Sequence, residues 1–181
     1  MPKKAGRNII IIAIVLANIA LDQVSKVIAR QNIERGETIE VLDHYFILTK
    51  VENTGAFLSL GSGFSEPMRQ ALLLILPALV LLGVLFYTFR QRDLPRGIMV
   101  GLACIVGGGI GNLYDRTLYG SVTDFMLIDI DIAQTGIFNI ADVSIMVGLG
   151  LILVNYRHLS RMEKQKKQQL AEANNANEAN A

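Results

Sequence analysis

Aspartates in or beside long apolar stretches are the residues of this chain best suited to acid–base chemistry. Asp142 is the only ionisable group of residues 138–156 apart from Tyr156, and no basic residue lies within four positions of it. Its partners must therefore come from another segment, and Asp124, in the preceding loop, could fold back towards it. Two carboxylates in a poorly solvated place share a proton, so one can activate water while the other protonates or polarises a carbonyl. The pair predicts peptide hydrolysis without a metal, but other aspartates are also available as partners: Asp115, Asp129 and Asp131.

Polar residues in three apolar stretches stand at similar distances from the arginine near one end of each stretch. Asp22, Asn112 and Asp142 lie 15, 16 and 15 residues from these arginines, which are Arg7, Arg96 and Arg157. At 1.5 Å per residue, helices would place all three roughly 22–24 Å from that end. This depth is under ~10 Å from the opposite surface of a ~30 Å hydrocarbon layer. Three helices that carry polar groups in one layer predict a site there.

Local spacing places further polar residues on the same helix faces. Asp22 and Lys26 are four positions apart and share a face with Ser25, and Asn139 lies three positions before Asp142. A third group has the same spacing: Asn112, Asp115 and Arg116. Ionisable residues within a membrane cost several kcal/mol unless they are paired or hydrated, so they mark function by default. The pairs Asp22–Lys26 and Asp115–Arg116 have an alternative interpretation as structural ion pairs.

The elements that must position these residues are four apolar stretches. Hydrophobic residues make up 51% of the 181-residue chain and charged residues only 18%, against roughly 25% in soluble domains. We expect an all-α membrane protein with four transmembrane helices, each near the required ~20 residues, over 8–29, 68–89, 97–115 and 137–157. The first stretch could instead be a cleaved signal peptide. Ala20 is preceded two positions earlier by Asn18 rather than a small residue, and the apolar character continues to Ala29, so we expect the stretch to be retained.

The basic residues predict the orientation of these helices. Eleven of the 17 lysines and arginines lie before the first stretch, between the second and third, or after the fourth, whereas the loops 31–67 and 116–136 are acidic. By the positive-inside rule both termini are cytoplasmic and these loops face outward. Residues 38–60 are rich in β-branched and aromatic residues around a turn, which predicts a small β-rich region at the outer surface.

Composition also excludes several classes of protein. A net charge of +1 lacks the broad basic surface of a nucleic-acid binder. A single cysteine, Cys104, excludes a disulfide framework or a thiolate zinc site, and His44 and His158 are too far apart in sequence for a histidine metal cluster. Residues 161–181 are polar and rich in Asn and Ala, so we predict a disordered cytoplasmic tail after one domain over residues 1–160.

Five short motifs occur in order along the chain. They are Asp22–Lys26 (DQVSK), 53–57 (NTGAF), 108–116 (GGIGNLYDR), Asp124-Phe125 and 138–142 (FNIAD). Together they resemble the lipoprotein signal peptidases (signal peptidase II), the aspartic proteases of bacterial membranes, over nearly all of residues 8–157. The chain departs from the family pattern at Thr123, where many members have a branched apolar residue, and residues 128–132 are unusually acidic.

The resemblance implies an active site and a substrate. It places the catalytic dyad on Asp124 and Asp142. The supporting or substrate-binding residues are Asp22, Lys26, Asn53, Gly55, Asn112, Asp115, Arg116, Asn139 and Ala141. It implies no metal, no cofactor, no nucleic acid and no obligate protein partner. The partners would be membrane lipids and diacylglyceryl-modified prolipoproteins, cut immediately before the lipidated cysteine, near the extracytoplasmic surface of the bacterial cytoplasmic (inner) membrane.

From this resemblance we expect the outer loop 38–60 to lie on the membrane surface, where Asn53 and Gly55 would clamp the substrate backbone. Two other functions remain as alternatives. A metal-dependent lipid phosphotransferase would gather several carboxylates around Mg²⁺, and the candidates are Asp22, Asp115, Asp124 and Asp142. A small transporter or assembly factor is the second alternative, but transporters usually bind near the midplane between repeated halves. Here the polar layer is off-centre and no repeat is found in the sequence.

Overall fold

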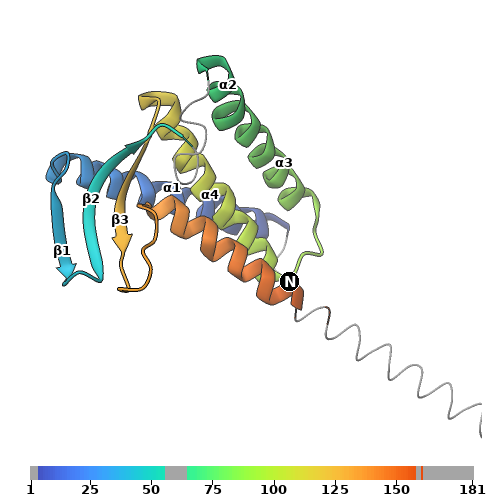
Figure 1. The fold of residues 1–181 in the computed structure, drawn as a ribbon. Coiled ribbons are helices and arrows are strands. Elements are labelled where there is room, and N and C mark those ends of the chain that lie inside the picture. Colours follow the sequence, from blue (N-terminus) through green and yellow to red (C-terminus); the bar gives the residue numbers. More distant parts are fainter. Residues whose placement is uncertain (1–3, 56–64, 158–159, 161–181) are drawn as a thin grey trace, which may run out of the picture.

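Four long helices and a small sheet make up the fold (Figure 1). The computed structural model describes residues 4–55, 65–157 and 160. In this part of the chain, four helices are long and apolar enough to cross a membrane: Gly6–Asn32, Ala71–Arg90, Arg96–Tyr119 and Ile140–Arg157. The four predicted apolar helices are therefore confirmed, although the third extends beyond residue 115 and the last begins at Ile140 rather than 137. The predicted tail at 161–181 lies outside the described residues.

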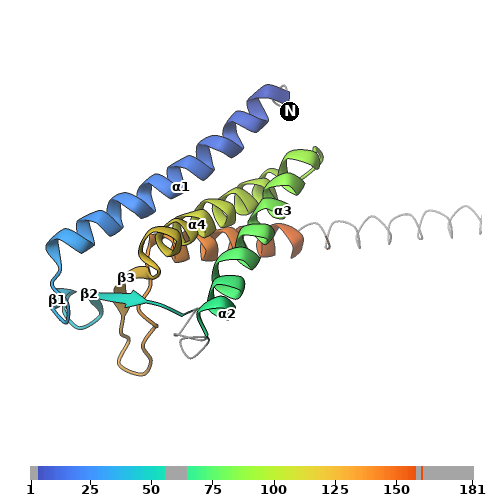
Figure 2. The ribbon, with the colours of Figure 1, turned by 90° about the horizontal axis from the view of Figure 1, so that it is seen from above.

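Helix α4 (Arg96–Tyr119) is the central element and packs along α1 (Lys4–Asn32) (Figure 2). Half of the most apolar stretch of α4 is buried inside the structure, whereas only about a sixth is buried in the corresponding stretches of α1 and the last helix. Ile11 and Val15 of α1 pack against Ala103 and Val106 of α4. The outward faces of α1 carry exposed aliphatic side chains, of which Ile9 and Leu16 are more than half exposed. This distribution suits helices that face lipid outside and each other inside.

The crossing of α4 with the last helix (Ile140–Arg157) depends on glycines. A Cβ atom built on Gly101 would lie 2.6 Å from the carbonyl oxygen of Gly148, and one built on Gly148 would lie 2.5 Å from the carbonyl oxygen of Gly101. Only glycine lets two helix backbones approach this closely. The glycines of this crossing therefore bring the polar residues of the two helices within contact distance of one another.

The second span is interrupted near its start. A short helix α2 (Glu66–Gln70) continues through a π-helical turn, η2 (Ala71–Ile75), into α3 (Leu76–Arg90). Pro77 stands at the start of α3. Proline has no backbone N–H to donate to the carbonyl of the preceding turn, and its ring would crowd that carbonyl. The π turn directly before Pro77 accommodates this irregularity. Most of α3 is apolar and exposed, and its described buried residues are Leu81 and Thr88.

A three-stranded antiparallel sheet lies across one end of the helices, where α1 finishes and the last helix begins (Figures 1 and 2). Its order is β1 (Thr38–Leu42), β2 (Phe46–Asn53) and β3 (Val122–Ile128). The predicted strands in 38–60 are confirmed for β1 and β2, and residues 56–60 lie outside the described residues. Strand β3 was not predicted, because its residues lie in the segment 116–136, which was interpreted from its acidic residues as an outer loop.

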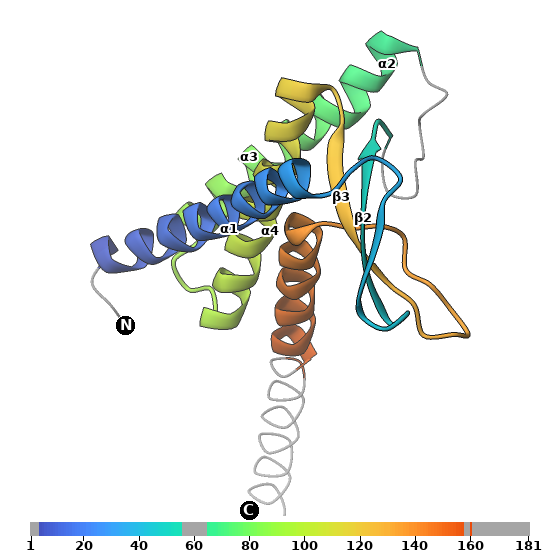
Figure 3. The ribbon, with the colours of Figure 1, turned by 90° about the vertical axis from the view of Figure 1, so that its left-hand side faces the viewer.

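Strand β3 lies beside the end of α1 and the start of the last helix (Figure 3). Gly120 ends α4 with φ of 71°, a left-handed conformation that glycine adopts without strain, and so turns the chain directly into β3. Phe125 and Met126 of β3 then pack against Ala29 and Ile33 at the end of α1. The segment before the last helix pairs with β3 as well, because the Phe138 amide donates to the Met126 carbonyl at 2.9 Å. The aspartate next to Phe125 is thereby brought to the start of the last helix.

Candidate active site

Asp142 is fixed by a reciprocal capping arrangement at the start of the last helix. The helix begins at Ile140, so Asn139 is its N-cap and Asp142 its third residue. The Asn139 side-chain oxygen accepts from the Asp142 amide at 3.0 Å, and Asp142 Oδ2 accepts from the Asn139 amide at 3.1 Å. This is a capping box with Asn and Asp in place of the usual Ser or Thr and Glu. The helix N-terminus also favours the negative charge of Asp142.

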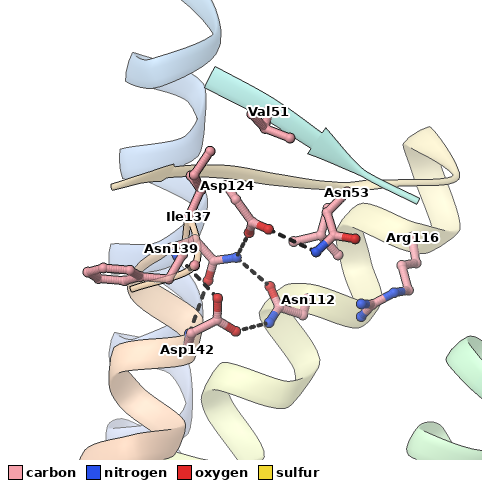
Figure 4. Close-up of a pocket in the computed structure, with 11 residues that line it drawn as sticks. Val51, Asn53, Asn112, Arg116, Asp124, Ile137, Asn139 and Asp142 are labelled. Carbon is pink, nitrogen blue, oxygen red and sulfur yellow. Dashed lines mark hydrogen bonds between the residues drawn. The ribbon is translucent and has the colours of Figure 1, made fainter. Parts of the chain in front are cut away.

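Asp124 reaches the same place from β3, where it is paired in register with Val51 of β2. Its side chain is only 4% exposed and points towards the start of the last helix (Figure 4). Asn53 Nδ2 donates to Asp124 Oδ2 at 3.0 Å, and Asn139 Nδ2 donates to Oδ1 at 2.6 Å. Asn139 therefore contacts both aspartates, Asp124 through its side-chain amide and Asp142 through its backbone and side-chain oxygen.

Asn112 of α4 connects Asp142 to a buried cation. Its Nδ2 donates to Asp142 Oδ1 at 2.9 Å, and its Oδ1 accepts from Lys26 Nζ at 2.9 Å and from Asn139 Nδ2 at 3.2 Å. Each of the two aspartates thus accepts hydrogen bonds from two amide groups, while the other carboxylate lies across the same cleft. The structure brings together the layer of Asp22, Asn112 and Asp142 that the sequence predicted, since Asp22 Oδ1 accepts from the backbone amide of Ala141 at 2.9 Å.

The two aspartates differ in electrostatic environment. Burial raises the pKa of Asp124 from its ordinary 3.8 to about 6. The Asn53 and Asn139 hydrogen bonds oppose this rise, and the nearby charge of Asp142 adds to it. Burial therefore favours the neutral form of Asp124. Asp142, by contrast, lies at a helix N-terminus and accepts from the Asn112 amide.

Behind Asn112 lies a buried ion network between α1 and α4. Lys26 Nζ pairs with Asp22 at 2.8 Å and with Asp115 at 3.2 Å, and Arg30 Nη2 pairs with Asp115 at 2.9 Å. The suggested Asp22–Lys26 pair is confirmed. The suggested Asp115–Arg116 pair is wrong, because adjacent helix residues point in different directions: within the described chain, Asp115 instead forms its ion pairs with α1. Arg30 was not predicted, although it continues the four-residue spacing of Asp22 and Lys26.

A cleft of about 350 Å³ opens onto the two aspartates. Its lining comes from β2, α4, β3 and the start of the last helix: Val51, Asn53, Asn112, Arg116, Val122, Asp124, Gly136, Ile137, Phe138, Asn139 and Asp142. Arg116 Nη2 donates to the Gly55 carbonyl at 3.2 Å, and the Gly55 amide donates to Asn53 Oδ1 at 3.0 Å. Arg116 Nε is buried and has no hydrogen-bond partner among the described residues. The cleft therefore combines apolar walls, two carboxyl groups and one guanidinium.

The four aspartates of the predicted site do not gather around one point. Asp22 and Asp115 face Lys26 and Arg30 on the far side of Asn112, whereas Asp124 and Asp142 line the cleft. In the described part of the chain, no group of three or more His, Cys, Asp or Glu side chains could hold a metal ion. The phosphotransferase alternative requires these four carboxylates to surround one Mg²⁺ ion, whereas the structure divides them into two separate pairs.

Fold and site together define a multi-pass membrane protein with two aspartates in one cleft at one end of its helices, of which Asp124 is buried and Asp142 half-buried. The chain matches the family signal peptidase (SPase) II over residues 14–157, and it belongs to that family. The lipoprotein signal peptidase of Clostridium novyi is 32% identical over 144 residues, 79% of this chain and 94% of the relative. Those of Geobacter sulfurreducens and Bacillus subtilis are 36% and 33% identical, over 85% and 86% of this chain and 93% and 97% of the relatives.

Solved structures have the same fold. A bacterial membrane enzyme determined by the in meso method at 2.3 Å resolution superposes with a TM-score of 0.72 and 28% identity, over 82% of this chain and 87% of the other. A second bacterial membrane enzyme, at 1.9 Å, gives a TM-score of 0.70 and 29% identity, over 81% and 91%. The likeness therefore covers about four fifths of this chain.

Proposed function

We propose that this protein is an aspartic endopeptidase that removes signal peptides from diacylglyceryl-modified prolipoproteins, cutting immediately before the lipidated cysteine. The observation that carries the proposal is the pair Asp124 and Asp142, which line one cleft and are bridged by Asn139. Family membership supports the substrate, because the relatives are lipoprotein signal peptidases. The peptidase domain would span residues 1–160.

The two aspartates have complementary roles in this proposal. Asp124 holds the shared proton, because burial favours its neutral form, and Asp142, which accepts hydrogen bonds at the start of the last helix, acts as the base. Asp142 takes a proton from water as the water oxygen attacks the scissile carbonyl carbon, and Asp124 gives its proton to the carbonyl oxygen. When the tetrahedral intermediate collapses, the amide nitrogen takes the proton from Asp142 and the carbon–nitrogen bond breaks. At the same time Asp124 takes a proton back from one of the two hydroxyl groups of the intermediate, so the carboxylic acid and the amine form and the pair again carries one proton, on Asp124.

The supporting residues hold this geometry in the proposed mechanism. Asn112 and Asn139 orient Asp142 and Asp124 through their amide groups. Asn53 fixes the second oxygen of Asp124, so its first role would be to position this carboxyl group, and contact with the substrate backbone would be additional. Arg116 lines the cleft, and its Nε–H, which has no partner among the described residues, would donate a hydrogen bond to a substrate carbonyl oxygen.

We further propose that both termini lie in the cytoplasm and that the sheet lies at the extracytoplasmic surface of the bacterial cytoplasmic (inner) membrane. The basic residues at the opposite end of the helices support this orientation. A lipidated signal peptide is itself embedded in the membrane, with its modified cysteine at the outer leaflet. A dyad at the sheet end of the helices is suited to such a substrate.

The test is cleavage of a diacylated precursor peptide by the purified full-length protein. We expect Asp124→Asn and Asp142→Asn each to lower the rate by a factor of about 10² to 10⁴. Asp93→Asn is the matched control, because Asp93 is exposed in the turn between α3 and α4. The same peptide without its diacylglyceryl group should remain uncut, and EDTA should leave the rate unchanged. Full activity in either dyad variant would exclude this mechanism, and loss of activity with EDTA would favour a metal-dependent one.

A further inference from the structure

The side of β3 opposite the cleft carries a second polar network. We propose that Thr123, Arg30 and Glu52 are positioning residues that hold Asp124 at the height and angle that the dyad requires. This inference rests on the proposed function, because it assigns a role in the reaction of Asp124. None of the three side chains lines the cleft, so they would act through the strand rather than on the substrate.

The strand geometry gives Thr123 its place. Successive side chains of a strand point to opposite faces, so when Asp124 faces the cleft, Thr123 points back towards α1. Thr123 is fully buried there. Its hydroxyl accepts from Arg30 Nε at 2.8 Å and donates to Glu52 Oε1 at 2.8 Å. Its backbone amide donates to Asp115 Oδ2 at 3.2 Å. The residue directly before Asp124 is therefore held by three elements: α1, β2 and α4.

Each partner of Thr123 is itself restrained. Arg30 pairs with Asp115 Oδ2 at 2.9 Å, and its guanidinium lies 4.2 Å from the ring centroid of Tyr119. Glu52 is the register partner of Thr123, and its second oxygen accepts from Ser121 Oγ at 2.6 Å. Glu52 thus binds Thr123 of β3 and Ser121, which lies directly before β3, on the side away from the cleft.

The two faces of this strand pair act on the same carboxyl group. On the cleft side Asn53 of β2 donates to Asp124, and on the reverse side the adjacent Glu52 accepts from Thr123. Strand β3 cannot slide or rotate relative to β2 without breaking both bonds. A displacement of about 1 Å at a reacting group can lower a rate about 10²-fold. A network that fixes β3 is therefore expected to influence kcat more than KM.

The test compares Thr123→Val, which keeps the shape of the side chain and removes the hydroxyl, with Thr123→Ser, which keeps the hydroxyl. We expect Thr123→Val to lower kcat for the diacylated peptide by about 10- to 100-fold with KM within about twofold. The alkaline limb of its kcat/KM profile should also shift, because Asp124 moves relative to its partners. Thr123→Ser should restore most of kcat. Thr117→Val is the matched control, since the exposed Thr117 hydroxyl bonds only within its own helix, to Leu113, among the described residues.

A second variant keeps the inference testable if Thr123→Val folds poorly. Arg30→Lys keeps a positive charge beside Asp115 and loses the Nε donor to Thr123, so we expect the same fall in kcat. In the double variant the two effects should not multiply, because both substitutions remove the same hydrogen bond from Arg30 Nε to Thr123. If either single variant lowers only the melting temperature, with kcat and pH profile unchanged, the network is structural and the inference is wrong. This outcome is distinct from failure of the proposed function, in which the wild-type protein would not cleave the diacylated peptide.

Discussion

At the scale of single residues, Asp124 lies in the proposed site but in surroundings that disfavour its charge. It is almost fully buried on β3, and burial raises its pKa to about 6. Such a group stabilises the folded protein when it is protonated, below the unfolded pKa of 3.8, and this contribution is lost as the pH rises through about 6. As the pH rises above about 6, Asp124 without substrate therefore loses its proton, and the buried charge that results lowers the stability of the folded protein.

This cost predicts how Asp124→Asn changes stability with pH. Relative to wild type, the variant should become more stable as the pH rises from 4 to 7.5, by up to about 3 kcal/mol, since one pKa unit corresponds to about 1.4 kcal/mol. For a chain of this size the change is several degrees in melting temperature. Thermal unfolding in detergent across this pH range measures it. A difference between variant and wild type that stays constant with pH would contradict the assignment. Asp93→Asn provides the baseline.

The bond from Asn53 predicts a shift in the pH profile of activity. Its hydrogen bond lowers the pKa of Asp124, so in Asn53→Ala this pKa rises further. If Asp124 acts as the acid, the alkaline limb of kcat/KM moves to higher pH, and kcat falls by about 10- to 100-fold because the carboxyl group loses one of its two amide donors. Thr38→Ala, an exposed change on β1, is the control. An unmoved limb in Asn53→Ala would assign the acid role elsewhere.

Lys26 has the strongest expected effect on stability among the buried residues. It is fully buried between Asp22 and Asp115 and also donates to Asn112. Removing one member of a buried ion pair costs about 3–5 kcal/mol, because the remaining charge has no partner. We therefore expect Lys26→Met to unfold at much lower temperature, and Lys26→Met with Asp22→Asn to recover part of the loss. Val24→Met, on the exposed face of α1, is the control. Equal melting of the single and double variants would mean that the pair is not coupled.

At the scale of elements, the helix crossings set the geometry of the site. Gly148 and Gly101 allow α4 and the last helix to touch, and these helices carry Asn112 and Asp142. Gly148→Ala should destabilise the protein by about 1–3 kcal/mol, as expected for overpacking against a backbone that cannot move aside. It should also lower activity by separating these two residues. Gly150→Ala is a matched control two positions away, since a Cβ there meets nothing within 4 Å. Similar melting temperatures for the two variants would contradict this packing.

Elements also explain which parts of the site the sequence could predict. The helices that carry Asp22, Asn112 and Asp142 were predictable, because apolar length and distance from the basic ends determine depth. The position of Asp124 depends on the pairing of β3 with β2. This pairing brings together residues far apart in the chain, such as Asn53 and Asp124, which are 71 positions apart. Apolar periodicity contains no information about such a pairing. The residues alone offered Asp124 as a partner of Asp142 beside three other aspartates, and the family motif singled it out. Arg30 was predictable from its spacing to Lys26, but its contact with Thr123 also required β3.

At the scale of the whole molecule, charge is divided between the two ends. Described basic residues at the helix ends away from the sheet are Arg7, Arg90, Arg96 and Arg157. The sheet, with acidic residues in and beside it, lies across the other end of the helices (Figure 1). The dyad lies at the sheet end, between β3 and the last helix. If the basic end is cytoplasmic, as the positive-inside rule predicts, substrates of the proposed peptidase would enter the cleft from the outer leaflet. In this proposal the orientation of the molecule determines which substrates can reach the two aspartates.

This orientation predicts the labelling of single cysteines in intact cells. In a Cys104→Ala background, Ile132→Cys places a thiol on the segment after β3, where the side chain is 91% exposed. Asp93→Cys places one in the exposed turn between α3 and α4, at the opposite end of the helices (Figure 2). A membrane-impermeant maleimide should label the first variant in intact cells with the inner membrane sealed, and the second only after that membrane is permeabilised. The reverse pattern would place the dyad on the cytoplasmic side, where a lipidated cysteine in the outer leaflet could not reach it. Labelling of the two sites after permeabilisation verifies that both thiols are reactive, so a difference before it reports the side of the membrane alone.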